Sequence, residues 1–304
     1  MPSPLQLRIA QEVFKIRSLY SKCNPVMAAS NKFHASAADP PTEFLEVKDE
    51  QTGSIRKIAY MKSPGPRSPG IIYIPGFMSH KSGIKSATLS QFCLKYGFPY
   101  VRYDPSGLGE SEGVHVTETL FSMWVQDAKE ILLRATDGPQ LVVGSSMGGW
   151  ISCLLAEKHP EKIEKILFIA PGINFHVRYD KVLRSQLDAK SLQKYEEGGV
   201  VSLYNPDYGS FPLRRAQFDD MAKLALSLEP GAVNVNCPIR ILHGVQDKDV
   251  PFKESLELLK ALKSTDVRLI YLKDGDHRLA SEEKLEVMFD TILDMTSSKS
   301  SSNV

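Results

Sequence analysis

The chain has 304 residues, of which 42% are apolar and 24% are charged. This composition is typical of a folded globular protein, and the length suits one large α/β domain. The formal net charge of +1 gives no basic field that would favour nucleic acid, and no apolar run of about 18 residues predicts a membrane-spanning helix.

The amino-terminal segment differs in charge from the rest of the chain. Residues 1–38 contain five lysines and arginines but only one acid, Glu12, and apolar side chains recur there at helical spacing. A basic, amphipathic, acid-poor start predicts a mitochondrial transit peptide over about residues 1–40, and therefore a mitochondrial location. The alternative is a disordered segment or a peripheral helix of a cytoplasmic protein.

The middle of the chain alternates between strand-like and helix-like segments. Residues 43–61 have hairpin character around a Gly-containing turn. Short apolar runs, typical of strands buried on both faces, occur at 70–74, 99–103, 141–143, 163–169, 239–242 and 267–272. Helix-like segments lie near 84–96, 117–135, 148–158, 252–263 and 281–295. This order predicts an α/β domain over 43–296, with a mostly parallel central sheet and helices on both faces.

One long stretch interrupts the alternation. Residues 172–235 are rich in charges and carry no obvious buried strand, although helical patterns occur near 178–195 and 213–227. A segment of this length between two core strands predicts a helical cap over the edge of the sheet where the strands end. The Ser-rich tail at 297–304 is expected to be disordered.

The segment 144–148 reads GSSMG and matches the pattern G-x-S-x-G. The pattern alone is weak, but here a buried strand precedes it and a helix follows it. In that context the serine sits at a sharp strand-to-helix turn that lifts its hydroxyl clear of the sheet. Ser146 is therefore the predicted nucleophile.

A serine hydroxyl attacks well only when a base removes its proton. His277 follows the last predicted strand and would lie at the same sheet edge as Ser146. His243 also ends a strand, but the glycine after it indicates a tight turn. The third catalytic group should be a carboxylate between the serine and the histidine, and Asp247 is the first choice, with Asp249 as the alternative or as a cap of the next helix.

An acyl-transfer site must also stabilise the negative oxygen of the transition state. One donor in this class of turn is the backbone amide after the nucleophile, here Met147. The second should come from the loop after the strand 70–74, and the Phe77 amide is the predicted donor.

The remaining motifs do not predict a cofactor. Residues 104–111 read DPSGLGES, which is Gly-rich after a strand but lacks both the G-x-G-x-x-G pattern and the lysine of a P-loop. The four cysteines are scattered, with no pair at metal-ligand spacing. We therefore expect neither a metal nor an organic cofactor.

Taken together, these segments resemble the α/β-hydrolase superfamily over about residues 43–296. Five segments carry a closer resemblance, to the α/β-hydrolase domain-containing protein ten family: IPGFMS at 74–79, DPSGLGESEG at 104–113, GPQLVVGSSMGGW at 138–150, NCPIRILHGVQDKDVP at 236–251 and DHR at 276–278. The resemblance places the family's nucleophile on Ser146, its acid on Asp247 and its base on His277. It implies a mitochondrial acyl-protein thioesterase or acyl-glucuronide esterase.

We therefore expect a serine hydrolase that cleaves acyl thioesters or esters through an acyl-enzyme intermediate. The expected substrates are S-acylated proteins, such as palmitoylated ones, or small acyl esters and acyl glucuronides. Two alternatives stay open: a lipid or small-ester esterase or a peptidase on the same fold, and a non-catalytic ligand-binding protein of hydrolase fold.

Overall fold

The structure is a computed structural model that describes residues 39–49, 53–206 and 209–297. Most of the predicted transit peptide and nearly all of the predicted disordered tail lie outside these residues. No helix within the described ranges combines the length and the apolar character needed to cross a membrane.

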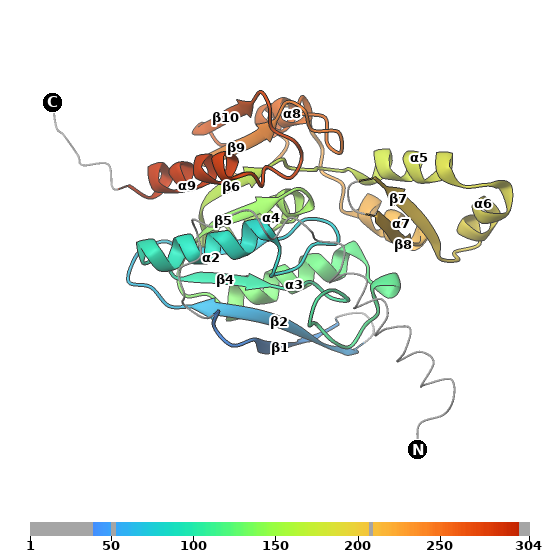
Figure 1. The fold of residues 1–304 in the computed structure, drawn as a ribbon, viewed down its shortest axis with the longest axis horizontal. Helices are drawn as coiled ribbons and strands as arrows, with labels where there is room; N and C mark the ends of the chain where they lie inside the picture. The colour runs from blue at the N-terminus through green and yellow to red at the C-terminus, as the bar shows by residue number, and fades with distance from the viewer. Residues whose placement is uncertain (1–38, 50–52, 207–208, 298–304) are drawn as a thin grey trace, which may run out of the picture. The chain divides into compact units, whose positions relative to one another are not determined.

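The described chain is built on one eight-stranded sheet (Figure 1). Its strands are β1 (Glu43–Lys48), β2 (Ile55–Ser63), β3 (Gly70–Ile74), β4 (Tyr100–Tyr103), β5 (Gln140–Ser145), β6 (Ile163–Ile169), β9 (Ile239–Gly244) and β10 (Val267–Leu272). They pair in the order β1-β2-β4-β3-β5-β6-β9-β10. Only β2 runs antiparallel to its neighbours, and every other pairing is parallel. The predicted fold class and the predicted hairpin at 43–61 are therefore confirmed.

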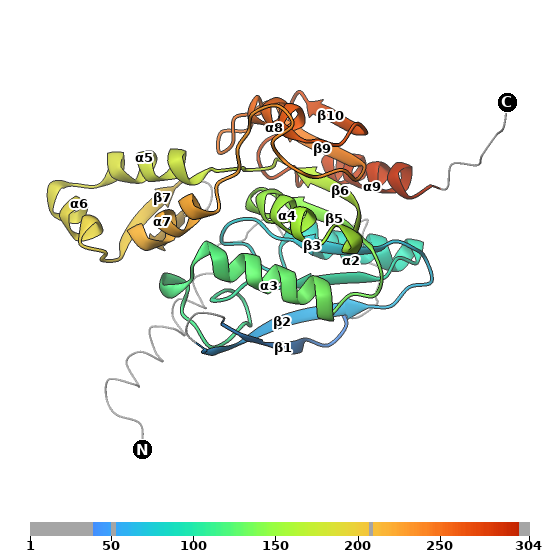
Figure 2. The same ribbon diagram turned by 180° about the vertical axis from the view of Figure 1, so that it is seen from behind.

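Helices cover both faces of this sheet. They are α2 (Ile84–Tyr96), α3 (Phe121–Arg134), α4 (Met147–Lys158), α8 (Glu254–Ala261) and α9 (Glu282–Thr296). Figure 1 shows α2 and α9 on the near face, and Figure 2, from behind, shows α3 and α4 on the opposite face. The helix pairs meet through aromatic rings, since Phe92 of α2 stacks on Phe289 of α9 at 4.6 Å and Phe121 of α3 contacts Trp150 of α4 at 4.3 Å between ring centroids.

Local sequence explains why the central elements lie where they do. All five residues of β3 and all six of β5 are buried, because helices cover both faces of these central strands. By contrast, β10 lies at one edge of the sheet and has no fully buried residue; its residues are partly buried or exposed. Position in the sheet, rather than composition, therefore decides how far each apolar run is buried.

The insertion between β6 and β9 differs from the sequence prediction. It contains the helices α5 (His176–Gln186), α6 (Ala189–Glu196) and α7 (Arg215–Lys223), but also a two-stranded antiparallel sheet of β7 (Val201–Asn205) and β8 (Gly209–Leu213). The predicted helical segments near 178–195 and 213–227 are present, but the hairpin was not predicted from sequence. The hairpin shows a period of two over only a few residues, which is too short a signal among so many charges.

Side chains at its base tie the two ends of this insertion together. The Asn174 side chain donates to the Leu226 carbonyl oxygen at 2.7 Å and accepts from the Leu226 amide at 2.9 Å. The Trp150 indole donates to the Leu224 carbonyl oxygen at 3.1 Å. Three hydrogen bonds therefore fix where the chain enters and leaves the insertion.

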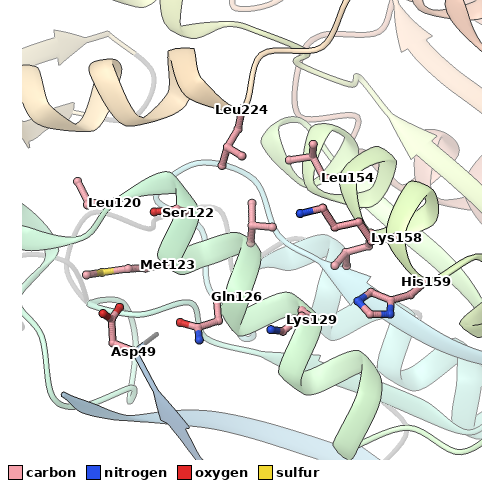
Figure 3. Close-up of a pocket in the computed structure, with 12 residues that line it drawn as sticks. Asp49, Leu120, Ser122, Met123, Gln126, Lys129, Leu154, Lys158, His159 and Leu224 are labelled. Atoms are coloured by element: carbon pink, nitrogen blue, oxygen red, sulfur yellow. The ribbon is translucent and has the colours of Figure 1, made fainter. Parts of the chain in front are cut away.

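A groove of about 260 Å³ runs beside α3 and α4 (Figure 3). Its apolar lining includes Leu120, Val125, Leu154, Leu155 and Leu224, and its basic lining is Lys129, Lys158 and His159. Ser146, Asp247 and His277 are not among its lining residues, so this groove is separate from the site described next.

Candidate active site

Ser146 occupies the turn between β5 and α4. The strand ends at Ser145 and the helix begins at Met147, so one residue makes the whole connection. Its backbone angles are φ 53° and ψ −119°, a combination that a non-glycine residue rarely adopts and that costs of order 1–3 kcal/mol. The geometry agrees with the strained turn that the sequence pattern predicts.

Two glycines allow this turn to lie so close to its surroundings. A Cβ at Gly148 would lie 2.1 Å from the Ile74 carbonyl oxygen, and a Cβ at Gly144 would lie 2.5 Å from Ser152 Oγ and 2.7 Å from the Gly148 carbonyl oxygen. Both contacts are shorter than van der Waals contact permits. Glycine is therefore required at 148 for α4 to pack against β3 and at 144 for β5 to pack against α4.

Hydrogen bonds from the end of β6 and the residues after it hold the Ser146 backbone. The Ser146 amide donates to the Ile169 carbonyl oxygen at 2.9 Å, and the Ser146 carbonyl oxygen accepts from the Gly149 and Gly172 amides at 2.9 and 3.0 Å. A Cβ at Gly172 would come 3.6 Å from Ser146 Oγ. The small residue at 172 therefore leaves open space beside the hydroxyl.

His277 joins Ser146 to Asp247. Its Nε2 lies 3.0 Å from Ser146 Oγ, and its Nδ1 lies 2.7 Å from Asp247 Oδ2. The His277 side chain is 14% exposed, whereas the Asp247 side chain is fully buried. The imidazole is therefore open to a bound substrate while the carboxylate behind it is sealed from water.

Asp247 lies in the segment 245–253, called the acid loop here. Its Oδ1 accepts from the Asp249 and Val250 amides at 2.9 and 2.8 Å, and its Oδ2 accepts from His243 and His277. Burial opposes ionisation of this carboxyl. The hydrogen bonds from His243 and His277, the charge of His277 and the Val250 amide outweigh burial and hold the pKa of Asp247 well below its usual range.

His277 lies in the segment 273–281, called the base loop here. The Gln246 amide donates to the Gly275 carbonyl oxygen at 2.9 Å, and a Cβ at Gly244 would come 2.2 Å from that same oxygen, so the acid and base loops are in direct contact. Lys85 of α2 donates to the Arg278 carbonyl oxygen. Desolvation lowers the pKa of Lys85 to about 8, although the Asp276 and Asp247 charges oppose this effect.

The two alternatives considered from sequence occupy other places. His243 is fully buried, and its Nε2 lies 2.9 Å from Asp247 Oδ2, the oxygen that His277 also contacts. The Asp249 carboxylate accepts from the Asn205 side chain at 3.0 Å. Asp249 does not cap the next helix, because α8 begins at Glu254 with Lys253 as its N-cap.

The segments that carry the two predicted oxyanion donors lie next to the nucleophile. Met147 is the first residue of α4, so its amide belongs to the first helical turn, where amides have no acceptor within the helix. A Cβ at Gly76 would lie 3.1 Å from Ser146 Cβ and 3.7 Å from Ser146 Oγ, so the loop that carries the Phe77 amide passes beside the hydroxyl.

The Phe77 side chain links this loop to the insertion. Its ring contacts Trp124 of α3 and Phe175 next to α5, each at 5.7 Å between centroids, and Phe211 of β8 at 6.1 Å. Aromatic side chains of the insertion thus pack directly on the residue next to Gly76.

Sequence reasoning missed a carboxylate that fastens the same loop. Buried Asp104 accepts from the Lys81 amide at 2.7 Å through Oδ1 and from Lys81 Nζ at 2.6 Å through Oδ2. From sequence, the segment 104–111 was only excluded as a cofactor site, and Asp104 was given no role. The available signal was an aspartate placed directly after the buried strand β4.

Three side chains place oxygen or nitrogen ligand atoms within 4.8 Å of one another: Asp247, Asp249 and His277. However, Ser146 and Asp247 engage the two nitrogens of His277, and Asp247 accepts four hydrogen bonds. This arrangement fits a chain for proton transfer better than a set of metal ligands, because a bound cation would displace hydrogen bonds that are already formed.

The parallel sheet, the serine at a strand-to-helix turn and the hydrogen-bonded serine, histidine and aspartate define a hydrolase of the α/β-hydrolase fold. The chain belongs to the family described as serine aminopeptidase S33, whose model matches residues 67–284.

Known relatives agree with this placement. The chain is 34% identical to the mouse protein named palmitoyl-protein thioesterase ABHD10, mitochondrial. The alignment spans 238 residues and covers 78% of each chain. It is 35% identical to the human protein of the same name over 246 residues, 78% of this chain and 76% of the relative. The solved structure of mouse alpha/beta hydrolase domain-containing protein 10 aligns with a TM-score of 0.71 at 31% identity, covering 83% of this chain and 98% of that one.

Proposed function

We propose that this protein removes long acyl chains from cysteine thioesters of proteins, with Ser146 as nucleophile, His277 as general base and Asp247 as the acid that orients His277. The hydrogen-bond chain from Ser146 Oγ through both nitrogens of His277 to Asp247 is the observation that carries the proposal. The choice of substrate is supported by the similarity to relatives named palmitoyl-protein thioesterase.

The reaction follows from these positions. Ser146 Oγ attacks the acyl carbonyl carbon while His277 Nε2 takes the hydroxyl proton, and the Met147 and Phe77 amides stabilise the resulting oxyanion. Collapse of this intermediate breaks the carbon–sulfur bond, and His277 returns the proton to the departing thiolate. Water then attacks the acyl-serine in the same way, which releases the fatty acid and regenerates Ser146.

A substrate panel with one acyl group tests the leaving-group class. Palmitoyl thioester, palmitoyl oxyester, palmitoyl glucuronide and palmitoyl amide should be compared at matched concentration, with Ser146→Ala as the blank. We expect the highest kcat/KM for the thioester, because a thiol with a pKa of about 8.5 leaves more readily than an alcohol or an amine. Fastest cleavage of the amide would instead indicate a peptidase, and rates equal to the blank for all four would refute hydrolysis.

We also propose that the protein acts in mitochondria. The basic, amphipathic segment 1–38 and the mitochondrial designation of the relatives support this location. A fusion of residues 1–40 to a green fluorescent protein should enter mitochondria. A matched fusion with its five basic residues changed to glutamine should stay in the cytoplasm, and cytoplasmic fluorescence from both fusions would contradict the proposal.

A further inference from the structure

One oxygen of the Asp247 carboxylate faces two imidazole rings. Oδ2 lies 2.7 Å from His277 Nδ1 and 2.9 Å from His243 Nε2. Only the first contact belongs to the proposed triad. The second contact joins another imidazole, that of His243, to His277 through Asp247. The mechanism above assigns His243 no role.

The surroundings of His243 determine which of its nitrogens carries the hydrogen. Nε2 lies near two acceptors, Asp247 Oδ2 at 2.9 Å and the Val250 carbonyl oxygen at 3.2 Å, so it must be protonated in order to donate. On the other side of the ring, Nδ1 lies 2.6 Å from Ser255 Oγ. In the neutral ring the Ser255 hydroxyl donates to Nδ1 and thereby fixes the tautomer.

His243 and Ser255 are both fully buried, away from water. His243 lies near the end of strand β9, and Ser255 lies in the first turn of α8. A carboxylate has about four lone-pair sites, and Asp247 accepts four hydrogen bonds, two from backbone amides and two from imidazoles. His243 thus fills the last acceptor position of Asp247.

We propose that His243, with its tautomer fixed by Ser255, is a positioning residue of the active site. Its hydrogen bond keeps Asp247 Oδ2 turned towards His277 and limits how tightly the carboxylate holds the His277 proton. That limit matters because His277 must take a proton from Ser146 and then release it to the leaving group. The inference rests on the roles of Asp247 and His277 in the proposed function.

Other charged groups lie around Asp247, His243 and His277 and must stay unchanged in a test. They are Lys85 of α2, Asp276 and Arg278 of the base loop, Asp249 of the acid loop and Glu254 of α8. The variants below alter none of them, so a change in pH dependence can be assigned to the His243 hydrogen bond.

The first test replaces His243 by a ring without hydrogen-bonding groups. In His243→Phe we expect kcat for the palmitoyl thioester to fall roughly 30- to 100-fold, with KM changed less than about twofold. The acid limb of the kcat/KM profile should move upward by about one pH unit, because Asp247 with one donor fewer holds the His277 proton more tightly. His243→Gln, whose amide can still donate, should recover about tenfold of the loss in kcat.

A second variant changes less of the structure than His243→Phe, so a loss of kcat in it is not explained by misfolding. Ser255→Ala leaves the ring in place but removes the hydroxyl that fixes its tautomer, and should lower kcat about 3- to 10-fold. Ser264→Ala is the matched control, because Ser264 is also buried and its hydroxyl donates only to the Cys237 carbonyl oxygen at 2.7 Å. This control should keep wild-type kcat.

A double-mutant cycle separates this role from simple packing. In an Asp247→Asn background, His243→Phe should add less than about a twofold further loss, because its effect passes through the carboxylate. The inference would be overturned if His243→Phe lowered kcat as much in the Asp247→Asn background as in the wild type. It would also be overturned if the acid limb of His243→Phe did not move and Ser255→Ala kept wild-type kcat. Neither result touches the proposed function, which the substrate panel and the Ser146→Ala blank test separately.

Discussion

Replacing Ser146 by alanine is expected to reduce kcat for the palmitoyl thioester by about five to six powers of ten. The hydroxyl is the atom that bonds to the acyl carbon, so no neighbouring group can take its place. The residual rate should exceed that of the thioester in water, because the Met147 and Phe77 amides would still polarise the carbonyl group. Pre-steady-state release of thiol measures the effect, since the wild type should give an acylation burst that the variant lacks.

Covalent labelling provides the control for this prediction. A fluorophosphonate probe should label the wild type and Ser145→Ala, but not Ser146→Ala. Ser145 is a matched control because it is the adjacent serine and is buried at the end of β5. Equal labelling of Ser146→Ala and wild type would show that the nucleophile is another residue.

Replacing Asp247 by asparagine should lower kcat by about four powers of ten while the fold is kept. The amide has nearly the same shape as the carboxylate, but its NH₂ group can face His277 Nδ1 as a donor. The ring would then carry its hydrogen on Nε2, which points at Ser146 Oγ, and could not accept the hydroxyl proton. Steady-state kinetics at saturating thioester measure the loss, and a decrease of less than about tenfold would contradict the assigned role.

The same residue makes a prediction about pH and stability. The hydrogen bonds to Asp247 hold its pKa below the usual value of about 3.9, so the folded state favours the ionised form. Its stabilising contribution is therefore complete above about pH 4 and is lost as the pH falls through the folded-state pKa. The difference in free energy of unfolding between wild type and Asp247→Asn, measured in urea, should be larger at pH 7 than at pH 3.

Much of the scaffold could be predicted from local sequence. The predicted helix at 84–96 coincides with α2, and every predicted core strand is present. Burial on both faces, which the apolar runs predicted, holds for β3 and β5 but not for the edge strand β10. The structure of the insertion was harder to predict. Its hairpin, β7 and β8, packs beside short charged helices, and a period of two over five residues does not stand out from that background.

The proposed triad could be selected from sequence for a different reason. Ser146 is marked by the local turn pattern, and the loops after parallel strands gather at one sheet edge, so His277 and Asp247 were expected near it. The structure brings the three side chains together in that order. Chain order could not predict the role of His243, which lies near the end of a strand at the same edge and contacts Asp247 rather than Ser146.

By itself, the amino-acid sequence determined the alternation of strands and helices, the turn that carries Ser146 and the order of the three proposed catalytic residues. These are local properties, set by side-chain size, hydrophobic period and the glycines that a close approach requires. The tertiary structure alone decided that two imidazoles share Asp247 and that Phe77 packs against the aromatic rings of the insertion. Such contacts join residues far apart in the chain, and their hydrogen-bond geometry exists only once the loops are fixed in space.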